Sequence, residues 1–286
     1  MQMSDESKMD DNPYQCGCKG RFMKSASIHP TAVIEPGVII GKDVTVGPFT
    51  VIEDDVTIGD GCLIGPHVMI GSGTRIGKCC RIFKSASIGL DPQDKKYAGE
   101  KTLTIIGDNT LIREFVTINK GTSATGETRI GCDCWIMAYC HIAHDCVIGD
   151  DVTISNGLAM AGHVEVGNHV TIGGIVPVHQ FTRIGDYAMV ASVARPFTDV
   201  VPYALVGADP TRIVGVNKIG LERKGFTADR IRNIKNAYKI LFREELQLQD
   251  ALSRLDETFS EDKDVKTIID FVRLSKRGIM RMGNGD

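Results

Sequence analysis

The chain has 286 residues, enough for one large domain with or without a smaller second one. Hydrophobic residues make up 42% of the chain and charged residues 24%, and the formal net charge is −3. This composition excludes a globally disordered chain and a nucleic-acid-binding surface over the whole protein. No apolar run approaches the roughly 20 residues that span a bilayer, and residues 1–12 are acidic, unlike a targeting peptide. We therefore expect a cytoplasmic protein without a transmembrane segment, or a mitochondrial or plastid matrix protein if a transit peptide was removed.

The first predicted region, residues 1–24, is an irregular segment without a repeat. It contains Cys16 and Cys18, whose role the sequence does not reveal. Nine cysteines could suggest disulfides or a metal site, but five of them share one phase of the repeat that follows, at Cys62, Cys80, Cys134, Cys140 and Cys146. We interpret those five as small buried hydrophobic residues.

A six-residue period organises residues 25–197. Aliphatic residues recur at every sixth position from Ile28 to Ile88, again from Ile106 to Ile118, and again from Ile130 to Val190. Neither a helix nor an alternating strand has this spacing, whereas a short strand followed by a tight turn does. Three such hexads make one triangular coil, and stacked coils bury an aliphatic column. The sequence therefore predicts a mainly β solenoid.

Two segments interrupt the period, at residues 90–104 and 120–128. We predict that both are loops leaving the solenoid, because such excursions cost little stability and often carry function. Inert surface loops are the alternative.

The last region, residues 198–286, loses the hexads and is predicted to be helical. Thr227 and Asp229 look like an N-cap and an acidic first turn ahead of an apolar stripe from Ile231 to Phe242. Further helices are expected at 246–259 and 264–279. We expect this domain to cap the open end of the solenoid.

Four of the seven histidines should gather on one edge of the solenoid. Ile142, Met160 and Val178 are spaced by 18 residues, one coil each, and His144, His163 and His179 follow them within three residues, so the three histidines form a column on successive coils with His141 beside them. Imidazole can accept a proton from a hydroxyl near neutral pH, which favours acid–base chemistry. In that case the Gly162 N–H could stabilise a tetrahedral oxyanion.

A zinc site is the alternative reading of these histidines, since this type of solenoid also houses zinc-dependent carbonic anhydrases. Those relatives carry two of their ligands five residues apart, whereas His141 and His144 are three apart and Asp145 follows directly. A non-catalytic structural solenoid is the other alternative. Our leading interpretation involves no metal and no cofactor.

The hexads resemble those of the hexapeptide-repeat transferases, which implies a left-handed parallel β-helix. From His29 to the C-terminal helices the chain also resembles the UDP-N-acetylglucosamine O-acyltransferases, which begin lipid A synthesis. The motifs that carry this resemblance are Gln93–Glu100, Ala143–Cys146, Leu158–His163, Val178–Phe181, Gly215–Asn217 and Arg223–Phe226.

The resemblance implies transfer of a 3-hydroxyacyl chain from acyl carrier protein to the 3-hydroxyl of UDP-N-acetylglucosamine, in a homotrimer with the site between subunits. It implies that His144 is the general base, that Asp145 orients it and that Gly162 serves the oxyanion. The implied substrate-binding residues are Asp94, Lys96, His141, His163, His179, Gln180, Asn217 and Arg223. Ser192 would be the acyl-chain ruler, although the chain-length preference itself is not readable. The chain departs from the family's pattern at Ile219, where an acidic residue is frequent, and at Ala191 and Ser192, where some members have glycines.

Two further observations bear on function. A related N-acyltransferase carries an extra N-terminal uridine-binding domain, for which residues 1–24 are too few. The segment from Thr211 to Arg243 contains nine basic residues and only two acidic ones. This excess of positive charge predicts that the acidic acyl carrier protein docks on the C-terminal helices.

Overall fold

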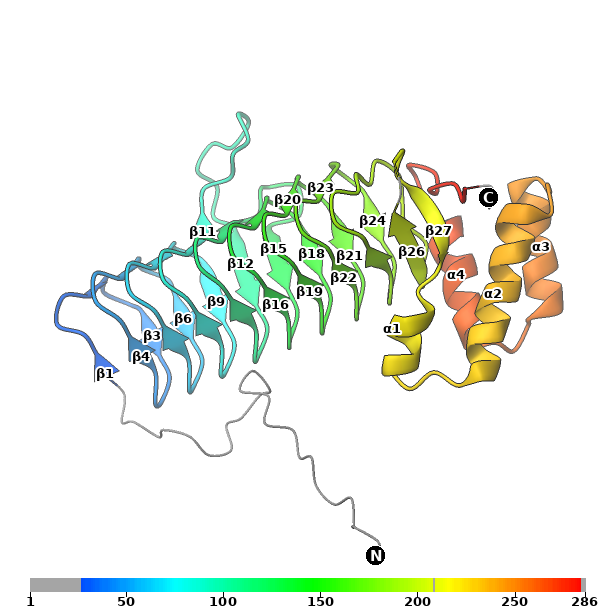
Figure 1. Cartoon of the computed structure of the whole chain (residues 1–286). Coiled ribbons are helices and arrows are strands. Elements are labelled where there is room, and N and C mark those ends of the chain that lie inside the picture. Colours follow the sequence, from blue (N-terminus) through cyan, green and yellow to red (C-terminus); the bar gives the residue numbers. More distant parts are fainter. Residues whose placement is uncertain (1–26, 208, 284–286) are drawn as a thin grey trace, which may run out of the picture.

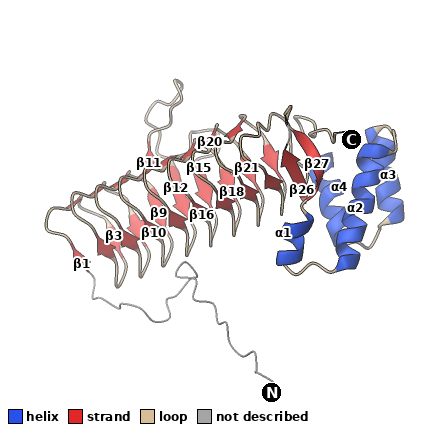
Figure 2. Cartoon of the chain, viewed as in Figure 1, coloured by secondary structure: helices blue, strands red, loops and turns tan. Residues whose placement is uncertain are grey.

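The computed structural model describes residues 27–207 and 209–283. Within them the chain winds into a prism of short parallel strands and ends in four helices (Figure 1). This is the expected left-handed parallel β-helix with a C-terminal helical part (Figure 2). The expected irregular segment 1–24, with Cys16 and Cys18, lies outside the described residues.

Each coil contributes one strand to each of three sheets, which form the walls of the prism. The first sheet contains β1 (Ser27–Ile28), β4 (Thr45–Val46), β7 (Leu63–Ile64), β10 (Arg81–Ile82), β13 (Leu111–Ile112), β16 (Trp135–Ile136), β19 (Thr153–Ile154), β22 (Thr171–Ile172), β25 (Met189–Val190), β26 (Ala204–Gly207) and β27 (Arg212–Val216). The second contains β2 (Val33–Ile34), β5 (Val51–Ile52), β8 (Met69–Ile70), β11 (Ser87–Leu90), β14 (Thr117–Asn119), β17 (His141–Ile142), β20 (Ala159–Met160) and β23 (Pro177–Val178). The third contains β3 (Ile39–Ile40), β6 (Thr57–Ile58), β9 (Thr74–Ile76), β12 (Leu103–Ile106), β15 (Glu127–Ile130), β18 (Val147–Ile148), β21 (Glu165–Val166) and β24 (Arg183–Ile184).

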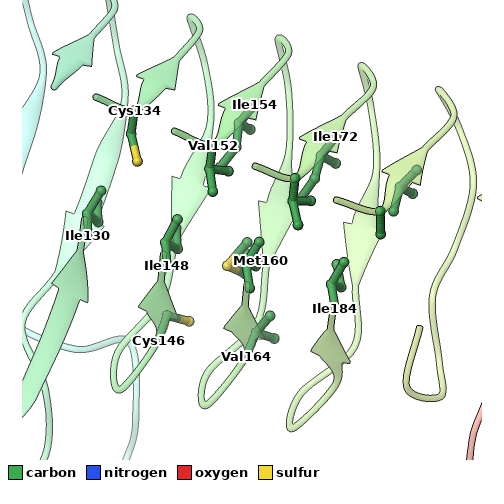
Figure 3. Close-up of a cluster of buried hydrophobic side chains, with 14 of the residues drawn as sticks. Ile130, Cys134, Cys146, Ile148, Val152, Ile154, Met160, Val164, Ile172 and Ile184 are labelled. Carbon is green, nitrogen blue, oxygen red and sulfur yellow. The ribbon is translucent and has the colours of Figure 1, made fainter. Parts of the chain in front are cut away.

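The interior of the prism is the aliphatic column that the hexads predict. Figure 3 shows Ile130, Ile148 and Ile184 pointing into it, together with two cysteines of the shared phase, Cys134 and Cys146. All five cysteines of that phase are at most 1% exposed, which confirms their interpretation as small buried residues. The walls are therefore stabilised mainly by burial of branched side chains.

Both interruptions of the period leave the prism at the same edge, between the second and third sheets. The excursions span residues 91–102 and 120–126, shorter than predicted because β11 continues to Leu90, β12 begins at Leu103 and β15 at Glu127. In Figure 1 the longer excursion stands out from the prism at β11. The strand pairing shows both excursions as longer coils. In a plain coil Thr45 lies opposite Leu63, whereas the two coils with excursions place Arg81 opposite Leu111 and Leu111 opposite Trp135.

The C-terminal part contains α1 (Lys218–Arg223), α2 (Ala228–Arg243), α3 (Leu248–Thr258) and α4 (Lys263–Arg273). Thr227 caps α2 as expected, because its side chain accepts a hydrogen bond from the Arg230 N–H. The Tyr238 hydroxyl donates to the Pro202 carbonyl, 2.6 Å away, and ties α2 to the end of the prism. No helix of the described residues is long and apolar enough to cross a membrane.

Two expectations for this part were wrong. Residues 198–207 and 209–217 are not helical: β26 continues the first sheet in parallel with β25, and β27 pairs with β26 antiparallel, which covers the open edge of the last coil. The last helix ends at Arg273 rather than Ile279. The backbone beyond it pairs instead with Asp199, whose carbonyl accepts from the Met280 N–H at 2.7 Å.

Candidate active site

The edge between the second and third sheets carries both excursions and most of the predicted site, and we call it the histidine edge. Its turns are residues 143–146, 161–164 and 179–182, which follow β17, β20 and β23. His141 lies opposite Ala159 and Ala159 opposite Pro177, so the three turns stack coil on coil.

His144 and Asp145 form a hydrogen-bonded pair on this edge. The His144 Nδ1 lies 2.7 Å from the Asp145 Oδ2, and the Asp145 side chain is completely buried. Because an ionised carboxylate only accepts, Nδ1 carries the hydrogen, and in the neutral imidazole Nε2 then holds the lone pair. His144 is therefore oriented as a base. Asp145 adopts φ 60°, a left-handed turn that aspartate tolerates.

The Asp145 carboxyl is ionised at neutral pH. Burial alone would raise its pKa, but hydrogen bonds from Thr125, His144 and Thr122 outweigh that penalty and lower the pKa to about 2. The pair therefore combines the Asp145 carboxylate, which is negatively charged at neutral pH, with the His144 imidazole as a base. The negative charge would stabilise the protonated form of that base.

Gly162 lies directly against the His144 ring. A Cβ at this position would lie 2.6 Å from the His144 Cε1 and 2.8 Å from its Nε2, so only glycine fits. Within residues 27–207 and 209–283, the Gly162 N–H donates to no backbone carbonyl. It therefore has no backbone acceptor in this part of the chain.

The expected histidine column forms only in part. The His163 ring meets the His144 ring edge-on at 5.2 Å, and its Nε2 lies 3.6 Å from the Asp145 Oδ2. The His163 ring also stacks on the Phe181 ring, with the centroids 4.6 Å apart. His179 instead donates from Nδ1 to the Gln180 carbonyl at 3.0 Å, and none of the described ring contacts joins it to His163.

His141 lies one strand before the turn. Its Nδ1 is 2.8 Å from the Thr117 hydroxyl, and burial, followed by the neighbouring His144, lowers its pKa. Its imidazole is therefore neutral at working pH, suited to hydrogen bonding rather than to carrying charge.

Sequence reasoning missed the residues that hold this pair. Thr122, Thr125 and Thr128 all bond to Asp145, and Phe181 packs on His163. In the sequence only their positions could have pointed to them: the threonines lie in an interruption of the period, and Phe181 lies in a repeated turn.

The remaining predicted residues lie elsewhere in the chain. Asp94 and Lys96 are in the excursion 91–102, where the Asp94 carboxylate accepts from the Lys96 N–H at 3.0 Å. Asn217 and Arg223 line a hollow of about 120 Å³ on the edge between the third and first sheets. Ser192 occupies a turn between the first and second sheets, where its Oγ accepts from the Gly174 N–H at 3.1 Å. No hydrogen bond or ion pair of the described residues joins these five to His144.

Ligand atoms of His144, Asp145 and His163 lie within 4.8 Å of one another, a spacing that a metal ion could use. The donors around Asp145 do not fit that use. Oδ1 accepts from the Thr122 N–H and the Thr125 hydroxyl, and Oδ2 from the Thr122 hydroxyl and His144. Since a carboxylate has about four lone-pair positions, all are filled.

Comparison with known proteins shows which family the chain resembles. Residues 199–280 match the family model for Udp N-acetylglucosamine O-acyltransferase, domain 2, and residues 23–54 and 127–158 match that for bacterial transferase hexapeptide (six repeats). The acyl-[acyl-carrier-protein]--UDP-N-acetylglucosamine O-acyltransferase of Myxococcus xanthus is 51% identical over 257 residues, covering 90% of this chain and all of the relative. The enzyme of that name from Paracidovorax citrulli is 54% identical over 261 residues, with 90% and 100% coverage.

The chain belongs to the UDP-N-acetylglucosamine O-acyltransferase family. A solved structure, the Francisella novicida UDP-N-acetylglucosamine acyltransferase, superimposes with a TM-score of 0.88 at 40% identity, covering 90% of this chain and 95% of the other. The match extends over both the prism and the C-terminal helices. Membership in this family disfavours the zinc-binding alternative.

Proposed function

We propose that this chain transfers a 3-hydroxyacyl group from acyl carrier protein to the 3-hydroxyl of UDP-N-acetylglucosamine, the first step of lipid A synthesis. The names of its relatives support both substrates. The observation that carries the proposal is the His144 imidazole, held at Nδ1 by the buried Asp145, with Gly162 packed directly against its ring.

In this reaction the sugar hydroxyl gives its proton to His144 Nε2 while its oxygen attacks the thioester carbonyl. The tetrahedral oxyanion accepts a hydrogen bond from the Gly162 N–H. As the intermediate collapses, the carbon–sulfur bond breaks and the thiol leaves with the proton from the imidazolium. Asp145 stays ionised and stabilises that imidazolium.

A homotrimer would assemble this site. In one chain the predicted residues occupy all three edges of the prism, so a neighbouring copy is needed to bring Ser192, Asn217 or Arg223 to His144. The edge between the first and second sheets, which we call the apolar edge, exposes large hydrophobic side chains suited to such a contact. They are Phe49, Phe115, Tyr139, Ile175 and Val193.

Substrate roles follow the same proposal. Asp94 and Lys96 would hold the sugar, and His141, His163, His179, Gln180, Asn217 and Arg223 would bind the nucleotide-sugar or shape its site. Ser192 would limit the acyl tail. We keep a cytoplasmic location as a prediction.

Acyl carrier protein would dock on the basic C-terminal part, through fewer basic residues than the nine counted in the sequence. Four of the nine basic residues have acidic partners, two of them contributed from outside the segment by Asp151 and Asp264. The others have no ion pair among the described residues: Arg212, Arg223, Lys235, Lys239 and Arg243.

A thioester-release assay tests the function directly. Purified protein, UDP-N-acetylglucosamine and a panel of 3-hydroxyacyl carrier proteins should release free thiol only when all three are present. Release with no dependence on the sugar nucleotide would contradict the proposal.

A further inference from the structure

The short excursion 120–126 brings threonines against the buried partner of the proposed base. Building on the proposed function, we infer that Thr122 and Thr125 are positioning residues that hold the Asp145 carboxylate against His144. Among the described residues neither side chain has a hydrogen bond to the imidazole or to a proposed substrate-binding residue, so they would act on catalysis through Asp145.

Several hydrogen bonds from this part of the chain converge on Asp145. The Thr122 N–H donates to Oδ1 at 2.9 Å, its hydroxyl donates to Oδ2 at 2.7 Å, and the Thr125 hydroxyl donates to Oδ1. Thr128, at the start of the next wall, accepts from the Asp145 N–H at 2.8 Å. Both the carboxylate and the backbone of Asp145 are thus fixed.

The excursion is what makes these contacts available. It lengthens the pairing offset from the 18 residues of a plain coil, as between Thr45 and Leu63, to 24, as between Thr117 and His141. The extra residues fold back over the turn that carries Asp145. The Thr125 hydroxyl also lies 3.0 Å from the Glu127 carbonyl, but a charged carboxylate is the stronger acceptor.

Few charged groups compete for Asp145. The titratable groups of the described chain near its carboxylate are His144, His163 and Cys146, and burial raises the pKa of the Cys146 thiol to about 12, so the thiol is uncharged. His141, which lies near His144, is neutral because burial lowers its pKa. Lys120, at the start of the excursion, is paired with Asp91 at 3.3 Å. The threonine donors therefore determine how much of the Asp145 charge reaches His144.

The direction of the effect follows from electrostatics. The hydroxyl dipoles point their hydrogens at the carboxylate and partly offset its field at His144. Without them the carboxylate loses its fixed orientation, which lowers the rate. The field at His144 also becomes more negative, which raises the imidazole pKa.

The test uses Thr122→Val and Thr125→Val, singly and combined, in the full chain. Valine keeps the shape and removes the hydroxyl. We expect the double variant to lose about tenfold in kcat, with KM for UDP-N-acetylglucosamine within about twofold of wild type. The His144 pKa, followed by NMR without substrate, should rise by roughly half a unit to one unit, and the acidic limb of kcat/KM should shift with it.

Two controls separate positioning from loop stability. Thr125→Ser restores a hydroxyl at the same place and should recover most of the activity. Thr102→Val removes another buried hydroxyl, which donates to the Gly121 carbonyl at 2.6 Å but not to Asp145, and should leave the His144 pKa unchanged.

The outcomes are distinct. An unshifted His144 pKa in the double variant, or an equal shift in Thr102→Val, would overturn the positioning role. If wild type transfers no acyl group, the proposed function fails. The NMR titration still decides whether the threonines set the state of His144.

Discussion

The histidine edge and the apolar edge belong to the same coils but differ in their turns and in the side chains that they carry. The first carries both excursions, a buried ionised carboxylate and a glycine pressed against an imidazole. The second has plain turns whose exposed positions hold residues such as Tyr139 and Ile175. The walls between them are alike, because each hexad has to bury one aliphatic side chain. Function in this fold is therefore free to vary at the edges, where substitutions leave the core intact.

The largest expected effect comes from removing the base. His144→Ala should lower kcat by about 10²–10⁴-fold, or roughly 3–5 kcal/mol of barrier, because general-base catalysis is lost. The oligomeric state in light scattering should not change, since His144 lies outside the aliphatic column. A variant that keeps more than about a third of the wild-type kcat would remove His144 from the mechanism.

Glycines on the two edges offer a matched pair. Gly162→Ala should displace the His144 ring, because the new Cβ would lie 2.6 Å from Cε1, and we expect about a hundredfold loss of kcat. Gly174→Ala, on the apolar edge, should be nearly silent, since its Cβ would have only one neighbour, the Asn156 carbonyl oxygen at 3.4 Å. Equal losses in steady-state kinetics would contradict the difference between the edges.

Acid stability should report on the buried carboxylate. The pKa of Asp145 in the fold is about 2, below its ordinary value of 3.8, so its stabilisation is complete above pH 3.8 and is lost as pH falls toward 2. Asp145→Asn lacks this dependence and tolerates the same φ. In urea unfolding, the stability difference between wild type and variant should shrink by about 2 kcal/mol between pH 5 and pH 2. A constant difference would show that Asp145 is not the titrating group.

The smallest effect concerns Ser192 on the apolar edge. If Ser192 limits the acyl tail as proposed, removing its side chain leaves more room, so Ser192→Gly should move the preferred 3-hydroxyacyl length upward. Each methylene is worth about 1–3 kcal/mol in kcat/KM. An unchanged ranking across a series of chain lengths would show that the groove ends elsewhere.

The sequence by itself determined the solenoid, the edge that carries the histidines and the capped helix after Thr227. These depend on local periodicity, which a six-residue spacing or an N-cap expresses directly. It also indicated His144, Asp145 and Gly162 as one group, because a fixed 18-residue coil converts spacing into proximity.

Only the tertiary structure decided what surrounds that group. The threonine contacts to Asp145 depend on how an irregular excursion folds back, and no period predicts that path. Pairing of β26 and β27 with the first sheet in place of a helix, and the end of α4 at Arg273, likewise depend on backbone groups of the last coil that need partners. Local patterns record what a segment prefers, whereas such unpaired groups and buried charges are satisfied only by segments distant in the sequence.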